Sequence, residues 1–163
     1  MIILSIGTNI GNRKANIENA ITALNAIGTV TAVSPIYSSE PWGFESENGF
    51  YNIALIIETS LSPLDLLKET QRIEKELGRT AKTTTAYTDR IIDIDIIDYN
   101  NQIINTQTLT LPHSLMHKRN FVLYPLTDIA PNWQHPTLKL IALELKKESN
   151  DTSTIHILNT TID

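Results

Sequence analysis

Two aspartates, Asp93 and Asp95, stand two positions apart in the isoleucine-rich segment RIIDIDIID, which covers residues 90–98. In a β-strand, the side chains of residues i and i+2 point to the same face, so the two carboxylates point together and the intervening isoleucines point the other way. At their Cα separation of about 6.5–7 Å, they repel by about 2.5 kcal/mol at an effective dielectric constant of about 20, and by about 0.6 kcal/mol in water. The pair is therefore compatible with a solvated strand face or with a cation site.

The cation that best fits such a pair is Mg²⁺, which binds one or two carboxylates and fills its remaining positions with water and substrate phosphates. Two carboxylates on one rigid strand can bracket two ions about 3.5–4 Å apart, as phosphoryl-transfer sites require. Asp98 has the opposite parity and is expected in the following turn. Asp89 precedes the strand, where it can cap the loop or support the metal ligands.

Two candidate cations accompany the acidic pair. Arg90 lies three residues before Asp93, where it can face a polyphosphate or form a salt bridge with a nearby aspartate. His113 follows Pro112, although a lone histidine is more often a surface or core residue. His117 stands four residues further on, a spacing seen in helical zinc sites, but no acidic third ligand follows at metal spacing. The pattern favours phosphate binding over zinc.

Hydrophobic periodicity and capping residues predict the elements that position these groups. Apolar runs predict four strands, at residues 2–6, 29–39 (stopped or bent by Pro35), 50–59 and 91–97. Asn12 is the expected N-cap of a first helix that ends at Gly28, and Ser62 that of a second helix that ends at Gly78. The aperiodic polar segment 79–89 is expected to be a loop that acts as a lid.

The C-terminal half is expected to be more irregular. The predicted features are a turn at 98–102, a short partner strand at 103–105, helical turns within 114–131, a last helix at 138–145 and a weakly ordered tail with a possible edge strand at 154–158. The order β-α-β-β-α-β predicts an α+β fold, a ferredoxin-like antiparallel sheet with helices packed on one face. We expect a single domain over residues 1–163, with a C-terminal extension over residues 136–163.

Composition narrows the function classes. The net charge of −5 argues against binding nucleic acid or an anionic membrane by bulk charge, and the absence of cysteine excludes thiol chemistry and disulfides. No signal peptide or membrane span is recognisable, so a cytoplasmic location is expected. An RNA-binding module shares the element order but needs a basic aromatic strand. A regulatory domain without chemistry would not need an acidic pair beside arginine and histidine.

Several short motifs, taken together and in order, resemble one family. They are IGTNIGN, FYNIAL, ETSLSP with TQRIEKELGR, RIIDIDI, and LTLPH with KRNFVLYPL, between residue 2 and about residue 136. Each is weak alone, but the ordered set is similar to 6-hydroxymethyl-7,8-dihydropterin pyrophosphokinase of folate biosynthesis. The resemblance implies an ATP-dependent enzyme that moves a pyrophosphoryl group onto the pterin hydroxymethyl oxygen and releases AMP. It implies two Mg²⁺ ions on Asp93 and Asp95, and we expect a monomer.

The resemblance also assigns the substrate contacts. Phe50 and Phe121, which would otherwise be read as core residues, would sandwich the pterin ring. Asn52 would pair with the amide-like edge of the ring, and the backbone from Ser39 to Trp42 would add hydrogen bonds. The residues that match the nucleotide side are Gln71, Glu74, Arg90, Thr110, His113 and Arg119, and Ile96 would offer backbone groups to adenine. We expect Arg90, His113 and Arg119 to serve catalysis.

One segment departs from the family pattern. Members usually enter the aspartate strand through RWGPR, whereas this chain has AYTDR, so that Tyr87 takes the tryptophan position and Asp89 the proline position. Ala81 and Thr108 also stand where many members carry arginine. The phosphate-facing cations would then reduce to Arg90, His113 and Arg119, helped by Lys82 or Arg79.

Overall fold

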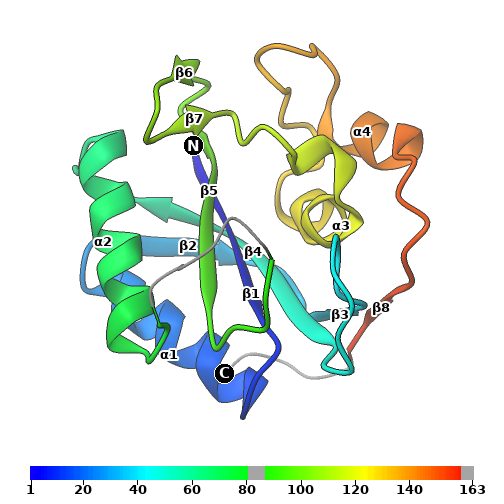
Figure 1. The fold of residues 1–163 in the computed structure, drawn as a ribbon. Coiled ribbons are helices and arrows are strands. Elements are labelled where there is room, and N and C mark those ends of the chain that lie inside the picture. Colours follow the sequence, from blue (N-terminus) through cyan, green and yellow to red (C-terminus); the bar gives the residue numbers. More distant parts are fainter. Residues whose placement is uncertain (81–86, 159–163) are drawn as a thin grey trace.

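Six strands form one sheet in the computed structural model, which describes residues 1–80 and 87–158. The strand order is β5-β1-β4-β3-β8, β2 also pairs with β4, and every pairing is antiparallel. The strands are β1 (Ile2–Thr8), β2 (Thr29–Val33), β3 (Tyr37–Ser39), β4 (Phe50–Glu58), β5 (Asp93–Tyr99) and β8 (Ile155–Ile157). The long strands β1 and β4 lie at the centre, and β1 carries β5 on its other side (Figure 1).

Helices cover both faces of this sheet (Figure 1). On one face, α1 (Arg13–Asn25) and α2 (Pro63–Glu76) bury Ile17 and Ile73 against strand residues such as Ile94. On the other face, α3 (Asn120–Ile129) and α4 (Ala142–Glu148) form a second core with Ile3 and Ile97. The expectation of helices on one face is therefore wrong. The apolar run of α3 needs a partner surface, and the second face of β1 and β5 provides it.

The predicted helix starts are confirmed by their hydrogen bonds. The side chain of Asn12 accepts from the backbone N–H of Ala15 at 3.1 Å, and that of Ser62 accepts from the N–H of Asp65 at 3.2 Å. Pro63 occupies the first turn of α2, where its missing N–H costs nothing. Pro35 interrupts the predicted strand 29–39 and separates β2 from β3.

A register shift in β5 changes the predicted parity of Asp98. Ile3 pairs with Asp98 and Leu4 with Ile96, so Ile97 is an additional residue on β5. Such a bulge moves every later side chain to the other face. Asp98 is consequently fully buried instead of lying in the turn, and burial raises the pKa of its carboxyl group.

The irregular part of the chain differs most from expectation. The strand predicted at 91–97 begins at Asp93 and continues to Tyr99. The segment 103–105 was expected to pair with it, but β6 (Ile104–Asn105) pairs with β7 (Thr110–Leu111) in a separate sheet. The predicted helical turns are the 3₁₀-helix η1 (Met116–Lys118) and α3, and the last helix begins at Ala142 instead of residue 138.

The predicted edge strand at the C-terminus is confirmed, because β8 pairs with β3. The centre of the predicted lid, residues 81–86 with Lys82, lies outside the described residues, as do residues 159–163. Within the described part of the chain, no helix combines the length and apolar composition that crossing a membrane requires.

The close approach of Gly28 to β4 provides a test of this packing. A Cβ atom at Gly28 would overlap the carbonyl oxygen of Glu58 and lie 3.0 Å from Cβ of Thr59, whereas one at Gly49 would lie 3.4 Å from its nearest neighbour. We expect Gly28→Ala to lower the free energy of unfolding by about 1–3 kcal/mol, because a packed backbone cannot move aside cheaply. Gly49→Ala is the matched control. Equal urea midpoints for the two variants would contradict the close contact of Gly28 with Glu58 and Thr59.

Candidate active site

One pocket gathers most of the predicted site residues. It lies between the sheet, the loop 40–49 and the segment 113–121 that leads into α3. Its walls come from parts of the chain that are far apart in sequence, which only the fold brings together. The lining residues are Ser5, Gly7, Ser39, Glu40, Trp42, Phe44, Phe50, Asn52, Tyr87, Arg90, Asp93, Asp95, His113, Ser114, Leu115, Arg119 and Phe121.

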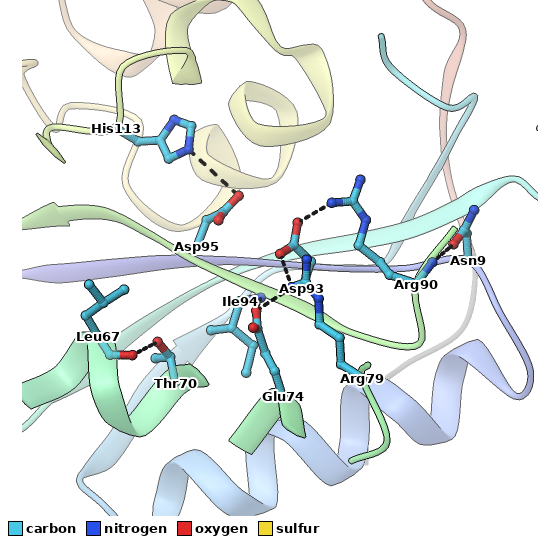
Figure 2. Close-up of polar contacts among 10 residues, drawn as sticks. All are labelled: Asn9, Leu67, Thr70, Glu74, Arg79, Arg90, Asp93, Ile94, Asp95 and His113. Carbon is cyan, nitrogen blue, oxygen red and sulfur yellow. Dashed lines mark hydrogen bonds and ion pairs between the residues drawn. The ribbon is translucent and has the colours of Figure 1, made fainter. Parts of the chain in front are cut away.

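Asp93 and Asp95 point into this pocket from β5, as their spacing predicts (Figure 2). Their side chains are 18% and 30% exposed, whereas Ile94 and Ile96 are each only 4% exposed. The isoleucines bury their side chains in the core under α1 and α2. The strand therefore has one apolar anchoring face and one acidic face, and the pair of carboxylates is held by the core.

Asp93 is flanked by two guanidinium groups (Figure 2). Arg79 donates to its Oδ1 at 2.6 Å, and Arg90 donates to its Oδ2 at 3.0 Å. Arg79 also pairs with Glu74 at 2.8 Å, and Glu74 accepts from the backbone N–H of Ile94 at 2.6 Å. Burial works against the charged form of Arg79, but the carboxylates of Asp93 and Glu74 outweigh it, so the pKa of Arg79 is raised. Helix α2 is thereby linked to the start of β5.

Asp95 faces His113 across the pocket. The Nε2 atom of His113 lies 3.9 Å from Oδ2 of Asp95 (Figure 2). The Nδ1 atom of the same ring accepts from the backbone N–H of Leu115 at 3.2 Å. Because Nδ1 accepts, the proton of the neutral ring belongs on Nε2, so His113 presents a donor to the acidic side of the pocket.

A second wall of the pocket is aromatic and amide-bearing. Phe50 packs edge-on against Phe44, with ring centroids 6.1 Å apart. Asn52 is buried beside it, and its amide donates to Oγ of Ser39 at 2.7 Å. A flat heterocycle would find here an aromatic face and a carboxamide that offers both a donor and an acceptor.

Arg119 lies among aromatic rings on the opposite side. Its guanidinium carbon is 4.6 Å from the ring centre of Trp42 and 5.5 Å from that of Phe121. It donates to the hydroxyl of Tyr87 at 2.8 Å, so the residue at the family's tryptophan position does reach the site. The Nε atoms of Arg119 and Arg90 are buried and have no hydrogen-bond partner among the described residues. Both arginines line the pocket, and two guanidinium groups beside one pocket are suited to an anion.

Asn9 joins three segments around the pocket. Its side chain accepts from the backbone N–H of Arg90 at 2.7 Å and donates to Asp89 at 2.7 Å and to the carbonyl of Asn48 at 3.1 Å. Asn48 also donates to Asp89 at 2.9 Å. Asp89, in place of the family's proline, thus fixes the chain just before Arg90 and ties it to the loop 40–49.

Comparison with known proteins agrees with this geometry. The family model for 7,8-dihydro-6-hydroxymethylpterin-pyrophosphokinase (HPPK) matches residues 3–131. A 2-amino-4-hydroxy-6-hydroxymethyldihydropteridine pyrophosphokinase of Aquifex aeolicus is 38% identical over 148 residues, which is 91% of this chain and 91% of that protein. The Bacillus subtilis enzyme of the same name is 43% identical over 77% of this chain and 75% of its own length. The chain belongs to the HPPK family.

Some relatives of this chain are much longer. The folic acid synthesis protein of Dictyostelium discoideum is 40% identical over 96% of this chain, which spans only 23% of that protein. A Plasmodium falciparum HPPK-DHPS structure with pteroate matches with a TM-score of 0.73 and 16% identity, over 90% of this chain and 44% of that chain. At that identity the likeness concerns the fold alone. Family membership confirms the resemblance and identifies a pyrophosphokinase, which is a transferase.

Four of the residues predicted on the nucleotide side do not line the pocket. Gln71 and Thr110 are exposed, on α2 and β7, and the side chain of Ile96 is in the core. Glu74 lies behind Asp93, where it holds Arg79. Two lining residues were not predicted: Ser5 and Gly7 lie on β1 and pair with Asp95 and Asp93 of β5. Their alternation with Leu4 and Ile6 is the signal that could have revealed them.

The Asn9 junction can be tested by substitution. Asn9 is 3% exposed, so Asn9→Ala would leave the N–H of Arg90 without its acceptor and cost about 1–3 kcal/mol in the free energy of unfolding. Faster hydrogen exchange of the Arg90 amide should accompany the loss. Asn48→Ala, which removes only a bond at an exposed position, should cost less than about 1 kcal/mol. If the two variants had equal free energies of unfolding and equal hydrogen exchange at the Arg90 amide, Asn9 would not join these segments.

Proposed function

We propose that this pyrophosphokinase transfers the β,γ-pyrophosphoryl group of ATP to the hydroxymethyl oxygen of 6-hydroxymethyl-7,8-dihydropterin and releases AMP. One observation carries the proposal: a single pocket holds the acidic pair on β5 and an aromatic, carboxamide-bearing wall on β4. The acidic pair suits the metal-bound polyphosphate of a nucleotide, and the aromatic wall with its carboxamide suits a pterin. The two substrates would therefore meet in one pocket, as direct transfer requires.

Asp93 and Asp95 are proposed to hold two Mg²⁺ ions. Carboxylate oxygens are the ligands that Mg²⁺ prefers, and it completes its shell with water and phosphate oxygens. Among the described residues, no three acidic, histidine or cysteine side chains gather into a metal cluster. Asp93 and Asp95 both line the pocket, and two carboxylates there fit an ion that takes substrate phosphate oxygens as further ligands. Mg²⁺ supplies charge neutralisation to the polyphosphate when it is bound.

Arg90, His113 and Arg119 are proposed to bind the transferring phosphates. Both arginines line the pocket that holds Asp93 and Asp95, and His113 directs Nε2 to the same space. Phosphoryl transfer depends on positioning and on electrostatic stabilisation of charge on the phosphate oxygens. These side chains would orient the β-phosphorus toward the pterin hydroxymethyl oxygen. The new oxygen–β-phosphorus bond forms as the bond from the β-phosphorus to the oxygen that bridges to the α-phosphate breaks. The electron pair of that bond leaves with AMP, and the hydroxyl proton passes to solvent.

Phe50, Phe121 and Asn52 are proposed to select the pterin. Two aromatic faces can stack on a flat ring, and the buried carboxamide can read its donor and acceptor edge. Ser39 supports Asn52 by its hydrogen bond, and the backbone near Trp42 adds further polar groups. Gln71, Glu74, Ile96 and Thr110 stay proposed contacts of the nucleotide. The resemblance supports them more than the geometry of the pocket does.

We also propose the fold type, the domain extent, the oligomeric state, the location and the lid, each from less specific observations. The order β5-β1-β4-β2, with α1 and α2 on one face, supports a ferredoxin-like unit within the larger sheet. The pairing of β8 with β3 supports a single domain over residues 1–163. A monomer in the cytoplasm, with small-molecule substrates and no nucleic acid, is proposed from the composition. Closure of residues 79–89 as a lid over ATP is proposed from their sequence alone.

The metal assignment is tested with ATP, Mg²⁺ and 6-hydroxymethyl-7,8-dihydropterin. Asp93→Ala and Asp95→Ala should each lower the rate of AMP release by about a hundredfold or more, because the charge on the phosphates loses its partner. Circular dichroism should show an unchanged fold. Asp65→Ala, an exposed carboxylate on α2 away from the pocket, is the control and should keep the wild-type rate. Wild-type AMP release by either pocket variant would overturn the metal assignment.

Gly7 offers a test of the pterin side. A Cβ atom at Gly7 would lie 3.3 Å from Oδ1 of Asn52 and 3.6 Å from Cδ1 of Phe50. Gly7→Ala should displace the carboxamide and raise the KM for the pterin by about tenfold, since small misplacements in a binding site are costly. The KM for ATP should change less. Gly49→Ala again serves as the control, and an unchanged pterin KM in Gly7→Ala would argue against Asn52 as a pterin contact.

A further inference from the structure

The segment that follows α4 contacts two walls of the pocket. Asp151 accepts a hydrogen bond from the backbone N–H of Asn120 at 2.8 Å, and its carbonyl accepts from the side-chain amide of Asn120 at 2.9 Å. A few residues later, Ile155 of β8 pairs with Ser39 of β3, which lines the pocket. In Figure 1 the segment descends from α4 to β8 along the edge of the molecule.

Asn120 is the first residue of α3, and its neighbours are both residues of the site. Arg119 and Phe121 flank it and line the pocket. The orientation of these two side chains is therefore set by the start of α3. The backbone N–H of Asn120 donates to Asp151, so a residue 31 positions away contacts that start.

The start of α3 lacks a local cap. Arg119 is the N-cap residue, it makes no side-chain capping bond, and the first turn contains no acidic residue. A helix N-terminus carries a partial positive charge, so a cation at this position is unfavourable. The carboxylate of Asp151 supplies both the missing acceptor and the compensating negative charge.

Asp151 is itself held in place. Its Oδ1 atom accepts from the N–H of Ser153 at 2.9 Å and from the hydroxyl of Ser153 at 2.6 Å. Its own N–H donates to Oγ of Ser149 at 3.2 Å. One carboxylate oxygen is thus fixed by its own loop, while Oδ2 is directed to Asn120, and the carboxylate is preorganised for this contact.

We propose that Asp151 is a positioning residue that caps α3 from a distance and thereby sets the direction of Arg119 and Phe121 in the pocket. The C-terminal segment acts through the backbone, because Asp151 does not line the pocket itself. The inference rests on the proposed function, in which Phe121 contacts the pterin and Arg119 contacts phosphate.

The test compares Asp151→Ala and Asp151→Asn with Asp65→Ala in full-length protein. Asp65 lies in the first turn of α2, so its removal also takes a carboxylate from a helix N-terminus, but away from the pocket. With saturating ATP, Asp151→Ala should raise the KM for 6-hydroxymethyl-7,8-dihydropterin by about fivefold, because Phe121 is no longer held in its direction and small misplacements in a binding site are costly. Asp151→Asn, which keeps an acceptor oxygen, should recover most of this change. Asp65→Ala should leave the KM unchanged.

A second readout does not depend on activity. Hydrogen exchange of the Asn120 amide should be faster in Asp151→Ala than in the wild type and in Asp65→Ala. A merely structural role would lower the active fraction, and hence kcat, with no change in either KM. An unchanged pterin KM in Asp151→Ala, with an active wild type, would overturn the proposal. An inactive wild type would count against the proposed function instead, and unchanged exchange at Asn120 would then still refute the cap.

Discussion

Strand β5 must be apolar on one face and acidic on the other, and the site depends on this constraint. Ile94 and Ile96 are fixed in the core beneath α1 and α2, which holds Asp93 and Asp95 above the other face. Two neighbouring carboxylates in a partly enclosed pocket repel each other. The guanidinium groups of Arg79, which follows α2, and of Arg90, at the end of the preceding loop, pair with Asp93 and compensate this repulsion.

The second face of the sheet gives this pocket its depth. Ser5 and Gly7 on β1 lie between the acidic strand and β4, and they are small where larger side chains would fill the space. Helix α3 covers the same face further along, and its beginning provides the opposite wall. A sheet with helices on only one face would leave these carboxylates on an open surface. The C-terminal half of the chain turns that surface into a pocket.

Much of this arrangement could be predicted from local sequence. Asn12 and Ser62 start their helices as capping chemistry requires, and the alternation around Asp93 fixes its face. The position of Asp98 could not be predicted, because a single additional residue, Ile97, reverses the parity that follows it.

Contacts between segments that are distant in sequence could not be predicted either. Nothing near Arg79 indicates that it bonds to Asp93 while holding Glu74. The covering of the second face by α3 and α4 depends on which apolar surfaces meet after folding. The resemblance to a known family identified the pocket residues because the motifs of that family reflect which distant segments contact each other after folding. Hydrophobic periodicity contains no such information.

The pairing of Asp93 with Arg90 and Arg79 has a consequence for how ligands enter. A divalent cation that approaches Asp93 meets a carboxylate whose charge two guanidinium groups already balance. If Arg90 binds a polyphosphate, as proposed, it gains another acceptor, and Asp93 would become more available to the cation. Anion and cation would then strengthen each other's binding by the same factor, as thermodynamic linkage requires. Under the proposed assignment, the ion pair at the start of β5 would couple the two binding equilibria, and the metal would be held most tightly when its nucleotide is present.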